Sequence, residues 1–189
     1  EFVNNFSQEN ILESYIKRIF STHIGATLVE KSLIERNNIF FTPGCICGED
    51  IEFIYKIMAS GSCGIVPYNL MIYRKRKSSV TNSGNKVNMT LADLNCKYRS
   101  IEFIELFKPL NYTKLVKILN NYIIFTKADL LYKLVKSGNL FSSNISINTS
   151  DYLTDLKKSI NLPNISFSKR IKFLITYLII SIINKNFTF

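Results

Sequence analysis

Apolar residues recur at intervals of three to four positions along most of this chain of 189 residues. That spacing is typical of helices with one buried face, and it predicts such helices over residues 8–20, 50–60, 92–107 and 114–136. Gly61 and Gly138 follow two of these segments, at the position where helices commonly end. A shorter helix is expected over residues 151–160, and a last one after Pro163. From residue 91 onward we expect helices only.

Three shorter stretches favour strands. The run Ile39–Phe41 precedes a turn at Pro43-Gly44 and predicts a short buried strand or extended edge. Residues 65–66 and 70–73 are rich in β-branched and aromatic side chains, with Pro67 between them at an edge or a bend. We therefore predict an α/β fold over residues 1–88, part of a mixed sheet, followed by a mainly helical region over residues 89–189.

Two adjacent carboxylates lie where the helix after this turn begins. Glu49 and Asp50 follow Gly48 directly and precede the apolar stripe of the helix. Acidic residues are common at helix starts, because they complement the partial positive charge of the first turn and cap its free N–H groups. Capping is thus one interpretation of the pair, and a catalytic role is the other.

Charge is distributed unevenly along the chain. The net charge is +10, yet the first 60 residues hold five Lys or Arg against eight Asp or Glu. The basic remainder is expected to meet an anionic partner such as phosphate, nucleic acid or an anionic membrane. The four cysteines lack the paired spacing of a zinc site, and there is one histidine, so we predict free thiols and no metal bound by this chain.

The last apolar segment carries no charge over residues 173–183. Such a stretch is shorter than the roughly 20 residues needed to cross a bilayer. Its basic flank at Lys169, Arg170 and Lys172 suits a helix that lies in a membrane interface. Packing of the same helix against its neighbours is an equally good interpretation.

Four motifs in order resemble the acceptor-side half of a bacterial, inverting family 2 glycosyltransferase with the GT-A fold. They are N-I-F-F at residues 38–41, G-E-D-I-E-F at 48–53, I-Y-R-K-R at 72–76 and S-S-V-T at 78–81. The resemblance covers residues 20–85. It implies transfer of a sugar from a nucleotide-sugar donor to a saccharide or lipid-linked acceptor in the synthesis of surface polysaccharide, at the cytoplasmic face of the cell membrane.

The resemblance also assigns roles to residues. Asp50 corresponds to the general base, which takes a proton from the acceptor hydroxyl as that oxygen attacks the sugar. Glu49 would orient the acceptor, with Gly48 beside it. Arg74, Arg76 and Ser78 would contact the donor phosphates, for which arginine geometry is well suited. His23, the only histidine, is a further candidate contact, although a lone histidine in a turn is more often a surface or packing residue.

The family's donor half does not appear in the sequence. Its D-x-D motif, which holds a divalent cation (Mg²⁺ or Mn²⁺) on the donor, is absent from these residues. We therefore expect the C-terminal part of a transferase, inactive without the donor-binding half. The absence of tryptophan removes the Q-x-x-R-W signature of processive synthases and favours transfer of a single sugar. The alternative is a non-catalytic, basic helical module that binds an anionic membrane or nucleic acid; its aromatic residues are not interleaved with the basic run, which disfavours nucleic acid.

Overall fold

The computed structural model describes residues 8–66, 68, 71–72, 85–138, 149–162 and 165–187. The helices over these ranges are α1 (Gln8–Ile16), the 3-10 turn η1 (Ile24–Ala26), α2 (Lys31–Arg36), α3 (Glu49–Ser60), α5 (Lys86–Phe107), α6 (Tyr112–Ser137), α7 (Thr149–Ile160) and α8 (Phe167–Phe187). The helices predicted from the apolar spacing are thereby confirmed, with boundaries that differ by a few residues.

The predicted α/β fold is wrong, because the described residues contain helices and irregular segments and no strand. Ile39 is fully buried, but its N–H donates to the carbonyl of Ile34 at 3.0 Å and not to a neighbouring strand. Phe41 lies flat on Phe53 of α3, with ring centroids 4.2 Å apart. The apolar run at 39–41 is therefore held by side-chain packing on a helix. Short apolar runs do not by themselves distinguish these two arrangements.

The structure does not confirm the other two predicted strands either. Residues 65–66 and 71–72 are irregular, and residues 70 and 73 lie outside the described residues. The division of the chain near residue 88 stays a prediction; α5 begins at Lys86 and packs on both α3 and α6.

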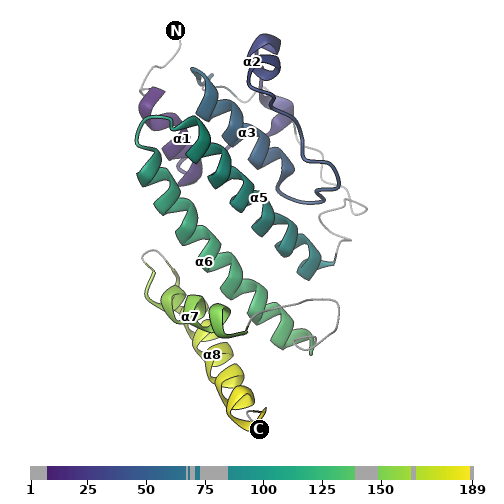
Figure 1. The fold of residues 1–189 in the computed structure, drawn as a ribbon, viewed down its shortest axis with the longest axis vertical. Coiled ribbons are helices and arrows are strands. Elements are labelled where there is room, and N and C mark those ends of the chain that lie inside the picture. The colour runs from purple at the N-terminus through teal and green to yellow at the C-terminus, as the bar shows by residue number, and fades with distance from the viewer. Residues whose placement is uncertain are drawn as a thin grey trace.

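Helices α5 and α6 form a long antiparallel hairpin that runs through the molecule (Figure 1). The connection between them is short, and Lys108 and Asn111 adopt left-handed backbone angles in it, with φ of 45° and 59°. Figure 1 shows α1, α2 and α3 at one end of this hairpin, and α7 and α8 at the other. The hairpin thus carries two separate groups of helices.

Each group has its own apolar core. The first core joins α1, α3, α5 and the first half of α6, around the buried side chains of Ile16, Ile54, Ile104 and Leu119. The second joins the later half of α6 to α7 and α8 and is built on Leu130, Leu131, Leu134, Leu156, Phe173 and Ile180. Because α6 contributes to both cores, it fixes the two groups relative to each other.

Helix α1 ends four residues earlier than the apolar spacing predicted. The N–H of Arg18 donates to the carbonyl of Tyr15 at 3.0 Å, and the N–H of Ile19 donates to Ser14 at 2.9 Å. This pair of bonds is the Schellman arrangement, which requires a left-handed residue at the position of Arg18. Arg18 has φ of 58°, in a region where glycine is usual. The bend directs the chain after α1 back across the hairpin.

Candidate functional site

The loop before α3 approaches α5 very closely at Gly48. This glycine is buried and has φ of +85°. A Cβ atom there would lie 3.3 Å from both Cβ and Sγ of Cys96 and 3.4 Å from Cα of Asp93. Both the backbone angle and the space favour glycine. Gly48 therefore positions the start of α3, and with it Glu49 and Asp50, against the middle of α5.

A buried ion pair fixes α3 to α5 one turn further along. Glu52 is 1% exposed. It accepts hydrogen bonds from Nε and Nη2 of Arg99 at 3.0 and 2.8 Å, from Nζ of Lys56 at 2.6 Å and from Oγ1 of Thr42 at 2.8 Å. Burial alone would raise the pKa of this carboxyl, but these hydrogen bonds outweigh burial and lower the pKa to about 2. Glu52 is the structural anchor of the site.

The adjacent carboxylates differ in their surroundings. Asp50 is partly exposed, and its Oδ1 accepts a hydrogen bond from the N–H of Ile51 at 2.8 Å. Glu49 is also partly exposed, but its Oε2 is buried and has no hydrogen-bond partner among the described residues. Three acidic residues lie in the first turn of α3, where their negative charge complements the helix dipole. The capping interpretation and a functional one are thus both compatible with the local geometry.

Asp50 lines a cavity of about 480 Å³ between α1, α3 and α5. We call it the Asp50 cavity. Tyr15 and Tyr55 form part of its wall; their rings meet edge to face, with centroids 5.6 Å apart. Burial and the nearby negative charge of Asp50 raise the pKa of Tyr15 to about 12. Tyr15 therefore stays a neutral hydroxyl beside the carboxylate at any physiological pH.

Charged side chains complete the wall of the Asp50 cavity. Arg18 contributes from the end of α1, and Asp93 and Lys97 contribute from α5, where they form an ion pair with each other. A hollow with aromatic walls and a few polar groups is the usual form of a small-molecule site. Its hydroxyl, carboxylate and cationic groups suit a polyhydroxylated or anionic ligand.

His23 holds a neighbouring turn. The side chain of His23 caps the turn η1, because its Nδ1 accepts a hydrogen bond from the N–H of Gly25 at 3.1 Å. His23 does not line the Asp50 cavity. Arg74, Arg76 and Ser78 lie outside the described residues.

Three cysteines meet near the site. The Sγ atoms of Cys45 and Cys96 are 3.0 Å apart, and both face the carbonyl of Cys47 at 3.3 to 3.4 Å. All four cysteines are free, as the sequence predicted. Burial and the neighbouring thiol of Cys45 raise the pKa of Cys96, which keeps it a neutral thiol. These contacts help to hold the loop of residues 42–48 on α5.

A divalent cation does not fit this part of the chain. In the described ranges no group of three or more His, Cys, Asp or Glu side chains could hold a metal ion. The resemblance places the cation on a D-x-D motif that these 189 residues lack.

Comparison of the chain with protein-family models, with curated proteins and with solved structures found no match. The functional residues must therefore be recognised from their own chemistry. The resemblance, and not their position at a helix start, singled out Asp50 and Glu49 as candidates. Sequence patterns missed Glu52 and Arg99, which lie far apart in the chain. The available signal for Glu52 was its position: it is an acidic residue one turn into the helix, on a face whose other residues are buried.

Proposed function

We propose that the chain forms the acceptor-binding part of a sugar transferase, with Asp50 as the general base. The position of Asp50 is the main support: its carboxylate stands at the start of a helix and borders a cavity that could receive a saccharide hydroxyl. A base must be ionised and within hydrogen-bond reach of the proton that it removes. Oδ1 accepts a hydrogen bond from the N–H of Ile51, and Oδ2 has no hydrogen-bond partner among the described residues, so one oxygen is available to the ligand.

The roles of the neighbouring residues follow from their placement. Gly48 and the Glu52–Arg99 ion pair position the carboxylate without contacting the acceptor proton. The neutral hydroxyl of Tyr15 can donate to or accept from the acceptor sugar. The nucleotide-sugar donor and its divalent cation would bind outside the described residues.

The test replaces Asp50 with Asn in the full reading frame that contains this chain. Transfer of label from a panel of radiolabelled nucleotide sugars to membrane lipids and saccharides is measured. General base catalysis contributes roughly 10²- to 10⁴-fold, so Asp50→Asn should lose transfer by that factor, with an unchanged unfolding midpoint.

Asp151→Asn is the matched control, because Asp151 is an exposed residue in the first turn of α7. It repeats the change of helix-end charge away from the cavity and should leave transfer unchanged. Full activity in Asp50→Asn would refute the assignment of the base. Equal losses in both variants would do the same.

A second candidate function, binding to an anionic membrane, is favoured by the surface of α8. Large apolar side chains 37–78% exposed recur along one face of this helix at Phe167, Ile171, Leu174, Ile175, Leu178, Ile179 and Ile182. The opposite face packs into the second core through Phe173, Thr176 and Ile180. No described helix is long and apolar enough to cross a bilayer.

Cationic side chains complement this apolar face. Arg170 and Lys172 lie in the same two turns of α8 as the first exposed apolar residues, which is the pattern of helices that lie in the interface of an anionic membrane. Both interpretations of α8 from the sequence thus have a face to support them: one face packs, and the other is available to lipid.

Flotation with vesicles of phosphatidylglycerol and phosphatidylcholine tests this function. Burial of one leucine side chain in the apolar part of the membrane stabilises binding by about 1.5–3 kcal/mol. Leu178→Ser should therefore weaken partitioning of the protein onto the vesicles roughly 10- to 100-fold. Leu106→Ser on α5 is the control, because Leu106 is 76% exposed but lies on another helix. Equal partitioning of the two variants would exclude α8 as the contact.

A further inference from the structure

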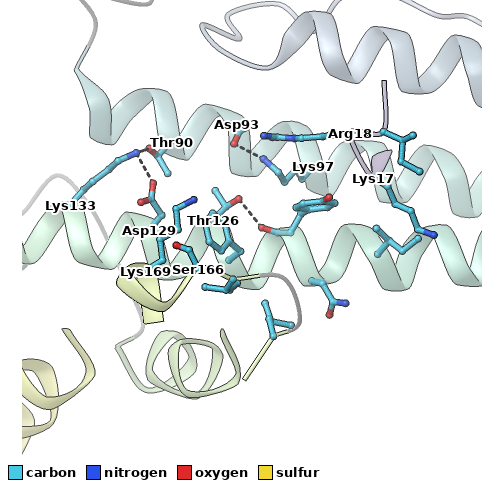
Figure 2. Close-up of a pocket in the computed structure, with 17 residues that line it drawn as sticks. Lys17, Arg18, Thr90, Asp93, Lys97, Thr126, Asp129, Lys133, Ser166 and Lys169 are labelled. Atoms are coloured by element: carbon cyan, nitrogen blue, oxygen red, sulfur yellow. Dashed lines mark hydrogen bonds and ion pairs between the residues drawn. The ribbon is translucent and has the colours of Figure 1, made fainter. Parts of the chain in front are cut away.

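A second hollow lies beside the Asp50 cavity, between α5, α6 and the segment that joins α7 to α8 (Figure 2). Its volume is about 800 Å³, within the range of sites for small organic ligands. We call it the basic groove. Five cationic side chains line it, against two carboxylates; the cations are Lys17, Arg18, Lys97, Lys133 and Lys169, and the carboxylates are Asp93 and Asp129.

Three of the five cations are neutralised within the protein. Lys17 pairs with Glu13, which lies just outside the groove, and Lys97 pairs with Asp93. Lys133 pairs with Asp129 at 2.7 Å and also donates to Oγ1 of Thr90 at 2.7 Å. Figure 2 shows the contacts of Lys97 and Lys133 as dashed lines. These ion pairs hold the wall of the groove in place, and they occupy both of its carboxylates, Asp93 and Asp129.

Arg18 and Lys169 remain without a carboxylate partner in the described part of the chain. The guanidinium of Arg18 lies 5.9 Å from the ring centroid of Tyr122, and Nζ of Lys169 lies 4.9 Å from that of Phe125. The two rings are three residues apart on α6 and thus neighbours on one helix face. Two cations from distant parts of the chain are therefore held over adjacent rings in one groove.

The backbone near Arg18 and near Lys169 is held in a defined conformation. Arg18 adopts its left-handed conformation at a cost of roughly 1–2 kcal/mol, which glycine would avoid. At the other side, the guanidinium of Arg170 donates to the carbonyls of Leu162 and Ile165 at 3.1 and 3.2 Å and so fixes the segment before α8. The left-handed end of α1 and the bonds of Arg170 thus place Arg18 and Lys169 at the wall of the groove.

We propose that the basic groove binds a phosphate or diphosphate ester. The surplus of cations suits an anion with more than one charge, and arginine with lysine is a common phosphate-binding pair. Apolar side chains of Ile118, Phe125 and Ile165 form the rest of the wall and would receive the organic part of the ligand. The groove borders the Asp50 cavity at Arg18, Asp93 and Lys97, and its binding of phosphate does not depend on sugar transfer. The phosphate could come from a lipid headgroup or from a soluble ester.

Titration calorimetry with sodium pyrophosphate tests the groove directly. Charge-assisted hydrogen bonds contribute about 1.5–3 kcal/mol each, so Arg18→Gly and Lys169→Gln should each weaken binding about 10- to 100-fold. Lys108→Gly is the matched control, because Lys108 is also a left-handed residue at a helix end but does not line the groove. It removes the same charge and relieves the same type of backbone strain, and it should leave the affinity unchanged.

A second measurement distinguishes the two phosphate sources. Vesicles of phosphatidic acid in phosphatidylcholine are compared with vesicles of phosphatidylcholine alone. If the groove takes a lipid headgroup, Arg18→Gly abolishes the preference for phosphatidic acid and pyrophosphate competes for it; if the groove takes a soluble ester, only the calorimetric titration responds. Absence of pyrophosphate binding to the unmodified chain would overturn the proposal. So would equal affinity in Arg18→Gly, or an equal loss in Lys108→Gly.

Discussion

Replacement of Gly48 by alanine tests how the start of α3 is held against α5. The left-handed backbone at φ +85° costs a non-glycine residue roughly 1–2 kcal/mol. The added methyl group would also lie 3.3 Å from the side chain of Cys96 and 3.4 Å from Cα of Asp93. The contact with Cβ of Cys96 is the tight one, and because the backbone fixes that atom it cannot rotate away; overpacking of this kind costs about 1–3 kcal/mol.

The two terms together predict that Gly48→Ala lowers the free energy of unfolding by roughly 2–5 kcal/mol. Gly44→Ala separates them, because Gly44 has φ of +72° and a Cβ there would meet nothing within 4 Å. Only the backbone term of roughly 1–2 kcal/mol applies at that position. The difference between the two variants therefore measures the close approach of the loop to α5.

Urea unfolding followed by circular dichroism gives both values. The comparison requires equal dependence of the free energy on urea in the two variants, since a changed slope would indicate a changed denatured state. Gly48→Ala should unfold at a clearly lower urea concentration than Gly44→Ala. Coincident curves would show that the loop does not touch α5 at Gly48, and the placement of Asp50 in the cavity would then lose its support.

Two further predictions concern stability. Because the folded pKa of Glu52 is lowered to about 2, its stabilising contribution is complete above the ordinary pKa near 4.3 and is lost as the pH falls toward 2. Glu52→Gln should therefore lower the free energy of unfolding by about 3 kcal/mol at pH 7. In this variant the free energy of unfolding should also fall less steeply between about pH 4.3 and 2 than in the unmodified protein. The same pH dependence in both proteins would contradict the ion pair. Arg18→Gly and Lys108→Gly should each raise the free energy of unfolding by about 1 kcal/mol, and a loss of stability in either would contradict the left-handed assignment.

The sequence predicted the longer helices well, because their apolar spacing is a local property, but it did not predict α2 at Lys31–Arg36. The start of α3 was equally readable, since Gly48 and the acids that follow it are signals of one short segment. The strand at Ile39–Phe41 was predicted wrongly. Its apolar side chains are used in a tertiary contact with Phe53, and a strand needs a partner that the periodicity of one segment does not reveal.

The less predictable features are those that join distant segments. Arg99 reaches Glu52 across 47 positions, and the cations of the basic groove come from α1, α5, α6 and α8. Within its own segment, each of these residues has the pattern of a charged side chain on the exposed face of a helix. Arg18 was placed within a helix by the apolar spacing, and only the Schellman end of α1 directs it into the groove. A sum of charges indicated an anionic partner but not where it would bind.

The two hollows share a border, and this border constrains what could occupy both. Arg18, Asp93 and Lys97 line the Asp50 cavity on one side and the basic groove on the other. Lys97 is only 9% exposed and is held by Asp93, which leaves Arg18 as the border cation without a carboxylate partner among the described residues. A ligand with a phosphate at Arg18 and a hydroxyl group at Asp50 would satisfy both sites, whereas a neutral saccharide would satisfy only one. A phosphorylated saccharide is therefore the acceptor chemistry most consistent with the two proposals together.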